Sequence, residues 1–413
     1  MSSSGKKKVT ATLLVAAGCA LALALGLAAK QRTAVASRVT EKVSFTNPGE
    51  KPVKAIKAVK VVKKTVKVVE RKVKPPEPPK VDVVFVLDTT GSMGGLISGA
   101  KKKIWSIANQ IVSGQPRPDV RIGLVGYRDK GDTYVTRRFD LTENIDDTYA
   151  HLQRFRAQGG GDTPEHVNLA LSDAMNKMSW RQGQDVLRLV FLVGDAPPHE
   201  GRDGLYSTKL ASQAVGMGIT LNAVRCGSSG ATATAWNRIA KMSGGMYASI
   251  RQDGGMVAVR TPVDERLKDL NMELSGTILP TGSAVTKTAV RRRAAMNAAM
   301  AAEVQAESAS YRATSGKLDS ADLLAGLARG KDLDAYAEDE LPAPVAAMPR
   351  AERKGYLKEV AQKRAKLKRE ITALSAKRSA YIKAKRPSSA TPAFDDTIEA
   401  ALKKQGKKIG VAY

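Results

Sequence analysis

Along the middle of the chain, segments with the apolar pattern of a buried strand alternate with segments that have the apolar spacing of a helix. Short β-branched runs predict buried parallel strands at 81–87, 120–127, 186–193, 219–225 and 246–250, and a more polar edge strand at 133–139. Apolar residues three to four positions apart predict helices at 95–112, 143–155, 164–179, 207–217 and 231–242. Strands separated by helices predict an α/β fold, with a doubly wound, mostly parallel sheet flanked by helices.

After residue 263 the pattern becomes helical. We predict a helix over 263–274, an alanine-rich helix that opens at Arg291 and runs to about Ala309, short helices over 316–345, and a long helix over 349–385. The long helix has a heptad pattern with arginine at alternate core positions, which fits packing within its own chain or a coiled coil over 350–385. The chain therefore divides into an α/β domain at 81–263 and a mainly α-helical, basic region at 264–413.

The N-terminus carries an uncharged apolar run, from Val9 to Ala29, behind three lysines. This run has the length of a membrane-spanning helix and the layout of a secretory signal, so residues 1–30 are predicted to be a signal anchor or a signal peptide. Residues 31–80 form a basic linker rich in lysine and proline, which favours an extended chain. We expect the α/β domain to lie outside the cytoplasm, periplasmic or on the cell surface, or to be secreted if the signal is cleaved.

Basic residues outnumber acidic ones, 67 against 40, and the formal net charge of the 413-residue chain is +27. The excess falls mainly on the two flanks of the α/β domain, which suits an anionic surface such as a membrane or an envelope polymer. The linker has no aromatic residues that could stack on bases, and we predict no specific nucleic-acid partner. With two cysteines, a disulfide framework and a four-cysteine zinc module are excluded.

Three predicted loops are rich in oxygen donors. Asp88, Thr90 and Ser92 follow the first strand, Thr163 precedes a helix, and Asp195 follows the strand at 186–193. Because parallel strands present their carboxyl ends at one edge of the sheet, we expect these side chains to converge there. Two carboxylates and three hydroxyls suit a hard, octahedral cation such as Mg²⁺ or Mn²⁺, and they leave a coordination position open for a partner's carboxylate.

Four further polar residues adjoin these loops and are expected to support the ligands or to line the rim: Asp162, Glu165, Arg128 and Asp129. Asp162 is an alternative to its neighbour Thr163 as the ligand from the second loop. Glu165 fits either a group that stabilises a helix N-terminus through the helix dipole or a group behind the ligands. Arg128 and Asp129 fit either an ion pair within a loop or a contact at the rim.

On these residues the sequence resembles the von Willebrand factor A (VWA) domain family. The metal-ion-dependent adhesion site of that family has an Asp-x-Ser-x-Ser loop, which Asp88, Thr90 and Ser92 match with threonine in the middle position. Thr163 matches its threonine from a second loop, and Asp195 matches its aspartate from a third. The Asp-Thr-Thr-Gly-Ser-Met, Gly-Tyr-Arg-Asp and Gly-Gly-Gly-Asp-x-Pro-Glu segments look like the hemicentin-type branch.

The resemblance implies a non-enzymatic module for adhesion or protein binding that uses a divalent cation to hold a carboxylate of a protein or polymer. A second hypothesis is an assembly factor that acts with a separate ATPase subunit, since the chain has no phosphate-binding Gly-x-x-x-x-Gly-Lys loop. A third is a polyanion-binding envelope protein that uses its basic flanks. An enzyme is disfavoured, because we find no nucleophile elbow and no general base paired with a suitable histidine.

Overall fold

The computed structural model describes residues 77–413 except 162, 257–258 and 386–391. The apolar run at 9–29 and nearly all of the basic linker lie outside the described residues, so the N-terminal anchor or signal stays a prediction. Within residues 77–413, apart from those gaps, no helix combines the length and the apolar character needed to span a bilayer.

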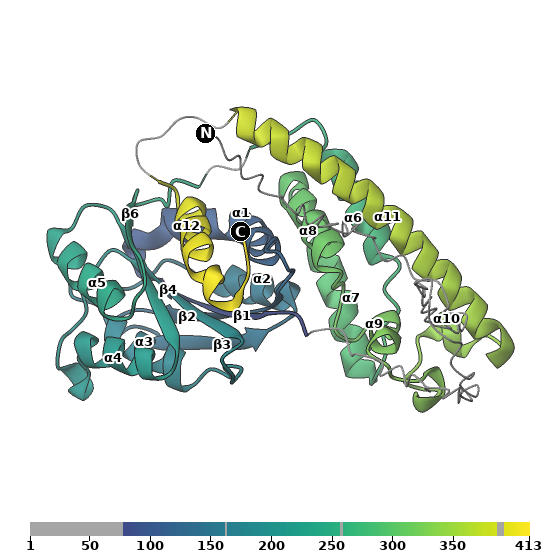
Figure 1. Ribbon diagram of the computed structural model, residues 1–413, viewed down its shortest axis with the longest axis horizontal. Helices are drawn as coiled ribbons and strands as arrows, with labels where there is room; N and C mark the ends of the chain where they lie inside the picture. The colour runs from purple at the N-terminus through teal and green to yellow at the C-terminus, as the bar shows by residue number, and fades with distance from the viewer. Residues whose placement is uncertain (1–76, 162, 257–258, 386–391) are drawn as a thin grey trace, which may run out of the picture. The chain divides into compact units, whose positions relative to one another are not determined.

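A six-stranded sheet forms the α/β domain, with the strand order β3-β2-β1-β4-β5-β6 (Figure 1). The strands are β1 (Lys80–Asp88), β2 (Asp119–Tyr127), β3 (Thr136–Thr142), β4 (Val186–Gly194), β5 (Ile219–Cys226) and β6 (Tyr247–Ile250). The pairs are parallel except for β2 with β3, which is antiparallel. The predicted doubly wound, mostly parallel sheet is confirmed. The edge strand begins three residues later than predicted, because residues 128–135 are used to connect it to β2.

Helices cover both faces of this sheet. One face packs on α1 (Gly94–Val112) and α2 (Ile145–Arg154), and the other packs on α3 (Val167–Asn176), α4 (Ser207–Gly216) and α5 (Gly230–Met242). The five helices predicted in this domain all form, with ends within three residues of the predicted ones. The central strands β1 and β4 are buried on both faces, which explains their nearly unbroken apolar sequences.

A helix that the sequence analysis did not predict, α12 (Phe394–Gln405), completes the first face. The Phe394 ring packs edge-on against Phe85 of β1, with ring centroids 6.1 Å apart, and Ile398 is fully buried in the same core. The side-chain amides of Gln405 and Asn222 exchange hydrogen bonds of 2.7 and 3.2 Å. The end of the chain therefore shares the core of the α/β domain, and residues 264–385 form an excursion between its last strand and its last helix.

This excursion consists of helices α6 (Asp264–Ser275), α7 (Ala284–Ala298), α8 (Ala302–Ser315), α9 (Leu323–Ala328), α10 (Ala343–Ala346) and α11 (Arg350–Lys385). The alanine-rich helical stretch predicted from Arg291 to about Ala309 is helical apart from 299–301, but it is divided between α7, which begins earlier, and α8. Ser283 caps the start of α7 by accepting a hydrogen bond from the Thr286 amide. The Gln305 side chain donates to the carbonyls of Ala298 and Met300 and so satisfies the backbone where α7 ends.

The long helix α11 packs on α6 and α8 of its own chain. Two of its heptad arginines are buried there: Arg364 pairs with Asp322 at 2.6 Å, and Arg378 pairs with Asp264 at 2.7 Å. The heptad face of α11 therefore packs within its own chain, which was the first of the two alternatives that the sequence left open. A coiled coil between chains would need this same face.

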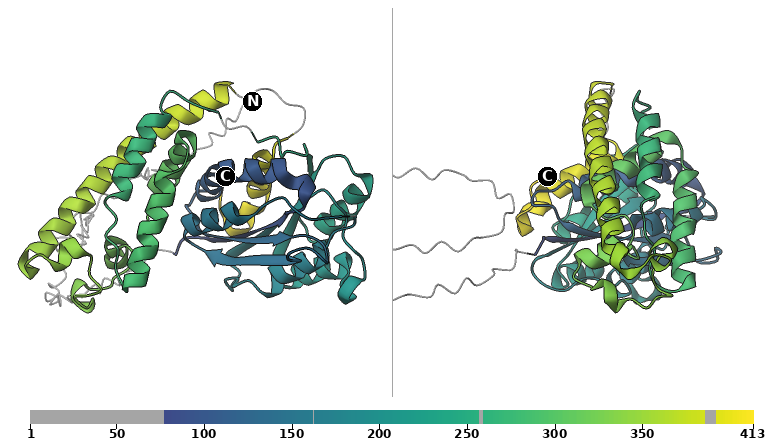
Figure 2. Two further views of the ribbon diagram at one scale, coloured as in Figure 1. Left: turned by 180° about the vertical axis from the view of Figure 1, so that it is seen from behind. Right: turned by 90° about the vertical axis from the view of Figure 1, so that its right-hand side faces the viewer.

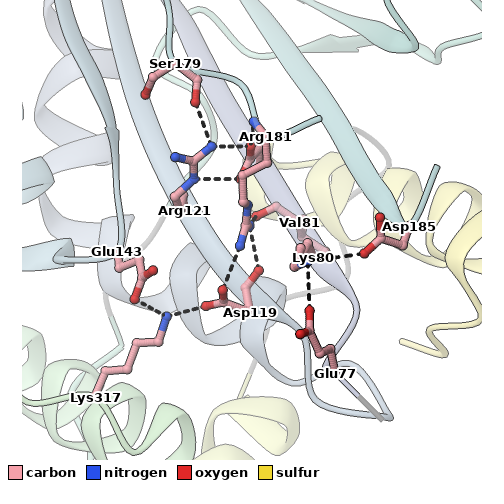
Figure 3. Close-up of polar contacts among 11 residues, drawn as sticks. Glu77, Lys80, Val81, Asp119, Arg121, Glu143, Ser179, Arg181, Asp185 and Lys317 are labelled. Atoms are coloured by element: carbon pink, nitrogen blue, oxygen red, sulfur yellow. Dashed lines mark hydrogen bonds and ion pairs between the residues drawn. The ribbon is translucent and has the colours of Figure 1, made fainter. Parts of the chain in front are cut away.

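An ion-pair network closes the edge of the sheet at which β1 begins (Figure 3). The fully buried Asp82 accepts hydrogen bonds from Arg121 at 3.1 and 2.7 Å and from Arg181 at 2.9 Å. Burial would raise the pKa of Asp82, but the two guanidinium groups outweigh burial and leave the pKa lowered. Arg181 also pairs with Asp119 at 2.7 Å, and Asp119 binds Lys317, which follows α8. The network therefore ties the sheet to the helical excursion.

Candidate metal centre

Backbone hydrogen bonds join the three predicted loops at the carboxyl edge of the sheet. The Gly91 amide donates to the Gly159 carbonyl at 3.0 Å, which links the first loop to the second. The Glu165 amide donates to the Pro197 carbonyl at 3.0 Å, and the His199 amide donates to the Glu165 carbonyl at 3.2 Å. The second loop is thereby linked to the third, and the loops that carry the predicted ligands form one structure.

Asp88, at the end of β1, is completely buried. Its Oδ1 accepts hydrogen bonds from the Thr90 amide at 2.9 Å and from the Thr90 hydroxyl at 2.6 Å, and that hydroxyl lies 3.4 Å from the Ser92 hydroxyl. Its Oδ2 is buried and has no hydrogen-bond partner. Burial raises the pKa of Asp88 to about 7, with the charge of Asp195 adding to the shift and the Thr90 hydrogen bonds opposing it. One carboxylate oxygen is thus oriented by its own loop, while the other has no hydrogen-bond partner of normal geometry, although the backbone amide of Asp195 is close enough to lower the pKa of Asp88.

Gly194, the last residue of β4, makes room for that second oxygen. A Cβ atom at this position would lie 2.9 Å from Asp88 Oδ2 and closer still to the hydroxyl oxygen of Tyr127. The Tyr127 hydroxyl is itself buried without a hydrogen-bond partner. Three neighbouring strands, β2, β1 and β4, thus converge on a small polar space that any side chain at position 194 would fill.

The other predicted ligands lie nearer to the solvent. Ser92 and Thr163 are exposed, and Asp195 is partly buried. Asp195 Oδ2 accepts a hydrogen bond of 2.6 Å from the side-chain amide of Gln252, which also donates to the Ser92 carbonyl at 3.3 Å. Residue 162 lies outside the described residues, so the choice between Asp162 and Thr163 as a ligand stays a prediction.

Gln252 was missed by the sequence analysis. It follows β6, at the same edge of the sheet as the other loops. The rule that carboxyl ends of parallel strands meet would have included this loop, but a single glutamine there carries no recognisable motif.

Glu165 faces the first loop. It is 3% exposed, and a Cβ atom on Gly160 would lie 2.8 Å from Glu165 Oε1 and 2.9 Å from Thr90 Cβ. Its Oε2 is buried without a hydrogen-bond partner. Burial raises the pKa of Glu165 to about 8, and the charge of Asp88 is the next largest cause. This placement favours the interpretation in which Glu165 supports the ligands.

Arg128 and Asp129 have separate partners. The buried guanidinium group of Arg128 donates to the Thr89 carbonyl at 3.2 Å and to the Arg156 carbonyl at 2.8 Å, and so holds the first loop. The Asp129 carboxylate lies 3.0 Å from Arg202 Nη1 and 3.2 Å from His199 Nε2. Arg128 therefore acts on the loop backbone, and Asp129 pairs with Arg202 and lies beside the His199 ring.

The donor set fits a hard cation in its chemistry. Within the described part of the chain, no three His, Cys, Asp or Glu side chains group together as a metal cluster. The predicted set differs from such a cluster, because hydroxyls supply three of its five ligands. The orphaned Asp88 Oδ2, in the space that Gly194 leaves open, is an oxygen that a divalent cation can satisfy.

A doubly wound sheet with a polar site at the carboxyl edge defines an α/β ligand-binding domain. Residues 82–252 match the family model of the von Willebrand factor A domain, and this part of the chain is a VWA domain.

Two curated proteins are similar to part of the chain. An ariadne-like RING finger protein of Acanthamoeba polyphaga mimivirus is 33% identical over 122 residues, which are 29% of this chain and 11% of that protein. The alpha-protein kinase vwkA of Dictyostelium discoideum is 30% identical over 121 residues, which are 29% of this chain and 19% of the kinase. The chain thus spans less than a fifth of the length of each of these relatives.

Solved structures that are similar to part of the chain include BatB from Bacteroides thetaiotaomicron, with 16% identity, a TM-score of 0.33, and coverage of 41% of this chain and 90% of that one. Proximal thread matrix protein 1 from the mussel byssus, described with a zinc-occupied MIDAS motif, has 15% identity and a TM-score of 0.33. That match covers 43% of each chain.

Proposed function

We propose that the VWA domain of this chain is a non-enzymatic binding module that depends on Mg²⁺ or Mn²⁺. The ion is held by the predicted ligands Asp88, Thr90, Ser92, Thr163 and Asp195. When bound, the cation supplies an electrophilic position that an oxygen of the partner can fill. The partner is a protein or polymer that offers a carboxylate.

The observation that carries this proposal is the buried, unpartnered Oδ2 of Asp88. A buried carboxylate oxygen without a donor costs free energy, and burial of such a group is normally accompanied by a pairing charge or a metal. Glu165 Oε2 has the same character on the other side of Thr90. We propose that Glu165 lies behind the ligands and that a bound cation favours its charged form, which burial and the charge of Asp88 otherwise disfavour.

The place of the module in the cell follows from the sequence alone. We propose that residues 1–30 anchor the chain in a membrane or direct its export, and that the VWA domain acts outside the cytoplasm. A reporter fusion that is active only after export, placed behind residue 413, would test this orientation.

Calorimetric titration of the full chain with Mg²⁺ and with Mn²⁺ tests the metal site. The full chain is needed because Phe394, far beyond residue 263, lies in the core of the domain. We expect Asp88→Ala and Asp195→Ala to lose cation binding, while Asp185→Ala retains it. Asp185 is an exposed aspartate at the opposite edge of the sheet, where it pairs with Lys80. Circular dichroism establishes that each variant is folded.

The titration is repeated with acetate, which stands in for a carboxylate of the partner. Binding of neither ion by the folded wild-type chain, with or without acetate, would overturn the proposal. Retention of the chain on immobilised poly-glutamate then tests partner chemistry. We expect the component of retention that EDTA removes to be absent in Asp88→Ala, whereas retention due to the positive net charge remains in both chains.

A further inference from the structure

The long helix α11 has two different faces. Its inward face carries three buried arginines, and each pairs with a carboxylate from elsewhere in the chain: Arg353 with Glu338, Arg364 with Asp322, and Arg378 with Asp264 and Glu307. These pairs fix the rotation of α11 about its own axis. The opposite face is turned to the solvent, and α11 forms an outer edge of the helical excursion in Figure 1 and in the left-hand view of Figure 2.

Four exposed cations lie along this outward face, and we call them the α11 strip: Lys354, Lys358, Arg369 and Lys383. A helix turns by about 100° and rises by about 1.5 Å per residue, so the strip occupies a sector of about 60° and a length of about 44 Å. In the part of the chain that the structure describes, no carboxylate lies within ion-pair distance of these four side chains. They are therefore cations without counter-charges.

The rest of the sector is smooth and uncharged. Exposed residues between the four cations are small, among them Ala365, Thr372 and Ala376. The acidic residues of α11 lie outside the sector: Glu352, Glu359 and Glu370. Glu370 is paired with Arg266. The strip therefore retains its positive charge along nearly the whole helix.

We propose that the α11 strip binds the surface of an anionic phospholipid bilayer through its charge. Because the row of cations is straight and about 44 Å long, all four cations can contact a flat surface at the same time. The phosphate strands of a nucleic-acid duplex wind around its axis, so a straight row of cations meets them only where a strand crosses the row. The strip also has no aromatic side chain on which single-stranded bases could stack.

The binding is electrostatic, because the sector has no large apolar side chain to enter the bilayer. A lysine or arginine near an anionic bilayer contributes about fivefold to binding, so four cations contribute up to several hundredfold. Such binding weakens as salt is added. This inference does not depend on the candidate metal centre, and its test is carried out in EDTA.

Lysine acylation of the full chain, read out by mass spectrometry, locates the bound surface. Vesicles of phosphatidylglycerol should slow acylation of Lys354, Lys358 and Lys383 at least threefold, and vesicles of phosphatidylcholine should not. Lys241 and Lys404 are exposed lysines on α5 and α12 and serve as internal references whose rates stay unchanged.

Two full-length variants with equal loss of charge complete the test. One carries Gln at the four strip positions, and the other carries Gln at four exposed lysines elsewhere: Lys241, Lys404, Lys407 and Lys408. Both retain the same N-terminal segment, so the difference between them isolates the strip. We expect the strip variant to bind phosphatidylglycerol vesicles about a hundredfold more weakly than the reference variant.

Three results would overturn the inference. The strip lysines could be acylated equally fast with and without phosphatidylglycerol. The reference variant could lose as much binding as the strip variant, in which case net charge and not the strip is responsible. Finally, duplex DNA could protect the strip where vesicles do not, which would assign this surface to nucleic acid.

Discussion

Replacing Phe394 by alanine tests whether the last helix belongs to the core of the VWA domain. Phe394 is 2% exposed and packs edge-on on Phe85, which stacks on Phe191 with ring centroids 5.5 Å apart. Truncation of a buried phenylalanine costs about 3–5 kcal/mol. The aromatic pair places this site in the upper part of that range. We therefore expect Phe394→Ala to lower the free energy of unfolding by about 4 kcal/mol, a large share of the stability of an ordinary domain.

Urea unfolding of the full chain, followed by tryptophan fluorescence, measures this change. Trp105 is buried in the same core as Phe394, and Trp236 is buried on the other face of the sheet, so both faces contribute to the signal. Tyr381→Ala is the matched control, because Tyr381 is an aromatic residue of similar size that is 37% exposed on α11. We expect its effect to stay below about 0.5 kcal/mol.

A cost below about 1 kcal/mol for Phe394→Ala would contradict the placement of Phe394 in the core of the domain. This placement is also contradicted if hydrogen exchange shows that the variant releases residues 392–413 while the sheet keeps its full protection. In that case α12 would be a separate unit attached to the surface, with its own local opening equilibrium.

Further substitutions test the ion pairs and the metal centre. Asp82→Ala should cost about 3 kcal/mol, because two largely buried arginines lose their carboxylate. The pKa of Asp82 is lowered in the folded state, so the stabilisation by its ion pairs is complete above the unfolded pKa of about 3.9. This stabilisation is lost as the pH falls through the folded pKa, and urea unfolding at a series of acidic pH values measures the loss. Asp322→Ala should lower the free energy of unfolding by about 3–5 kcal/mol, and adding Arg364→Met should recover part of it in the same assay. Gly194→Ala should weaken Mg²⁺ binding at least tenfold in calorimetry, whereas a second change, Tyr127→Phe, should restore stability more than affinity. Equal Mg²⁺ affinity of Gly194→Ala and wild type would contradict the placement of the ion.

The layered fold was predictable because its signals are local. A strand buried on both faces needs a continuous apolar run, and β1 and β4 have one. A helix that covers a sheet needs an apolar stripe, and α1 has one. The edge strand β3 is mostly exposed or half-buried and carries Arg137 and Arg138. Its sequence therefore has no continuous apolar run from which its ends could be predicted.

The candidate site was predictable where one loop carries its own chemistry. Asp88 and Thr90 are bonded to each other within the first loop, so their spacing in the sequence already describes their geometry. Gln252 was missed and the role of Glu165 was left between two alternatives, because their roles depend on the neighbouring loops that they meet in space. A buried oxygen without a partner, as in Glu165, leaves no trace in the order of residues.

The heptad pattern of α11 could be interpreted only once the distant carboxylates that pair with its arginines were known. Between two identical helices, arginines at core positions of a heptad would face each other and weaken the seam. In this chain, the partner carboxylates of Arg364 and Arg378 stand 42 and 114 positions away, where no period in the sequence connects them. A guanidinium group buried without its carboxylate would cost several kcal/mol, so these pairs permit one rotation of α11. That rotation also decides which lysines face the solvent. The exposure of the α11 strip is therefore a consequence of the buried ion pairs on the other side of the helix. Breaking those pairs should weaken the packing of α11 and also allow it to rotate, so that the four cations would no longer share one exposed face.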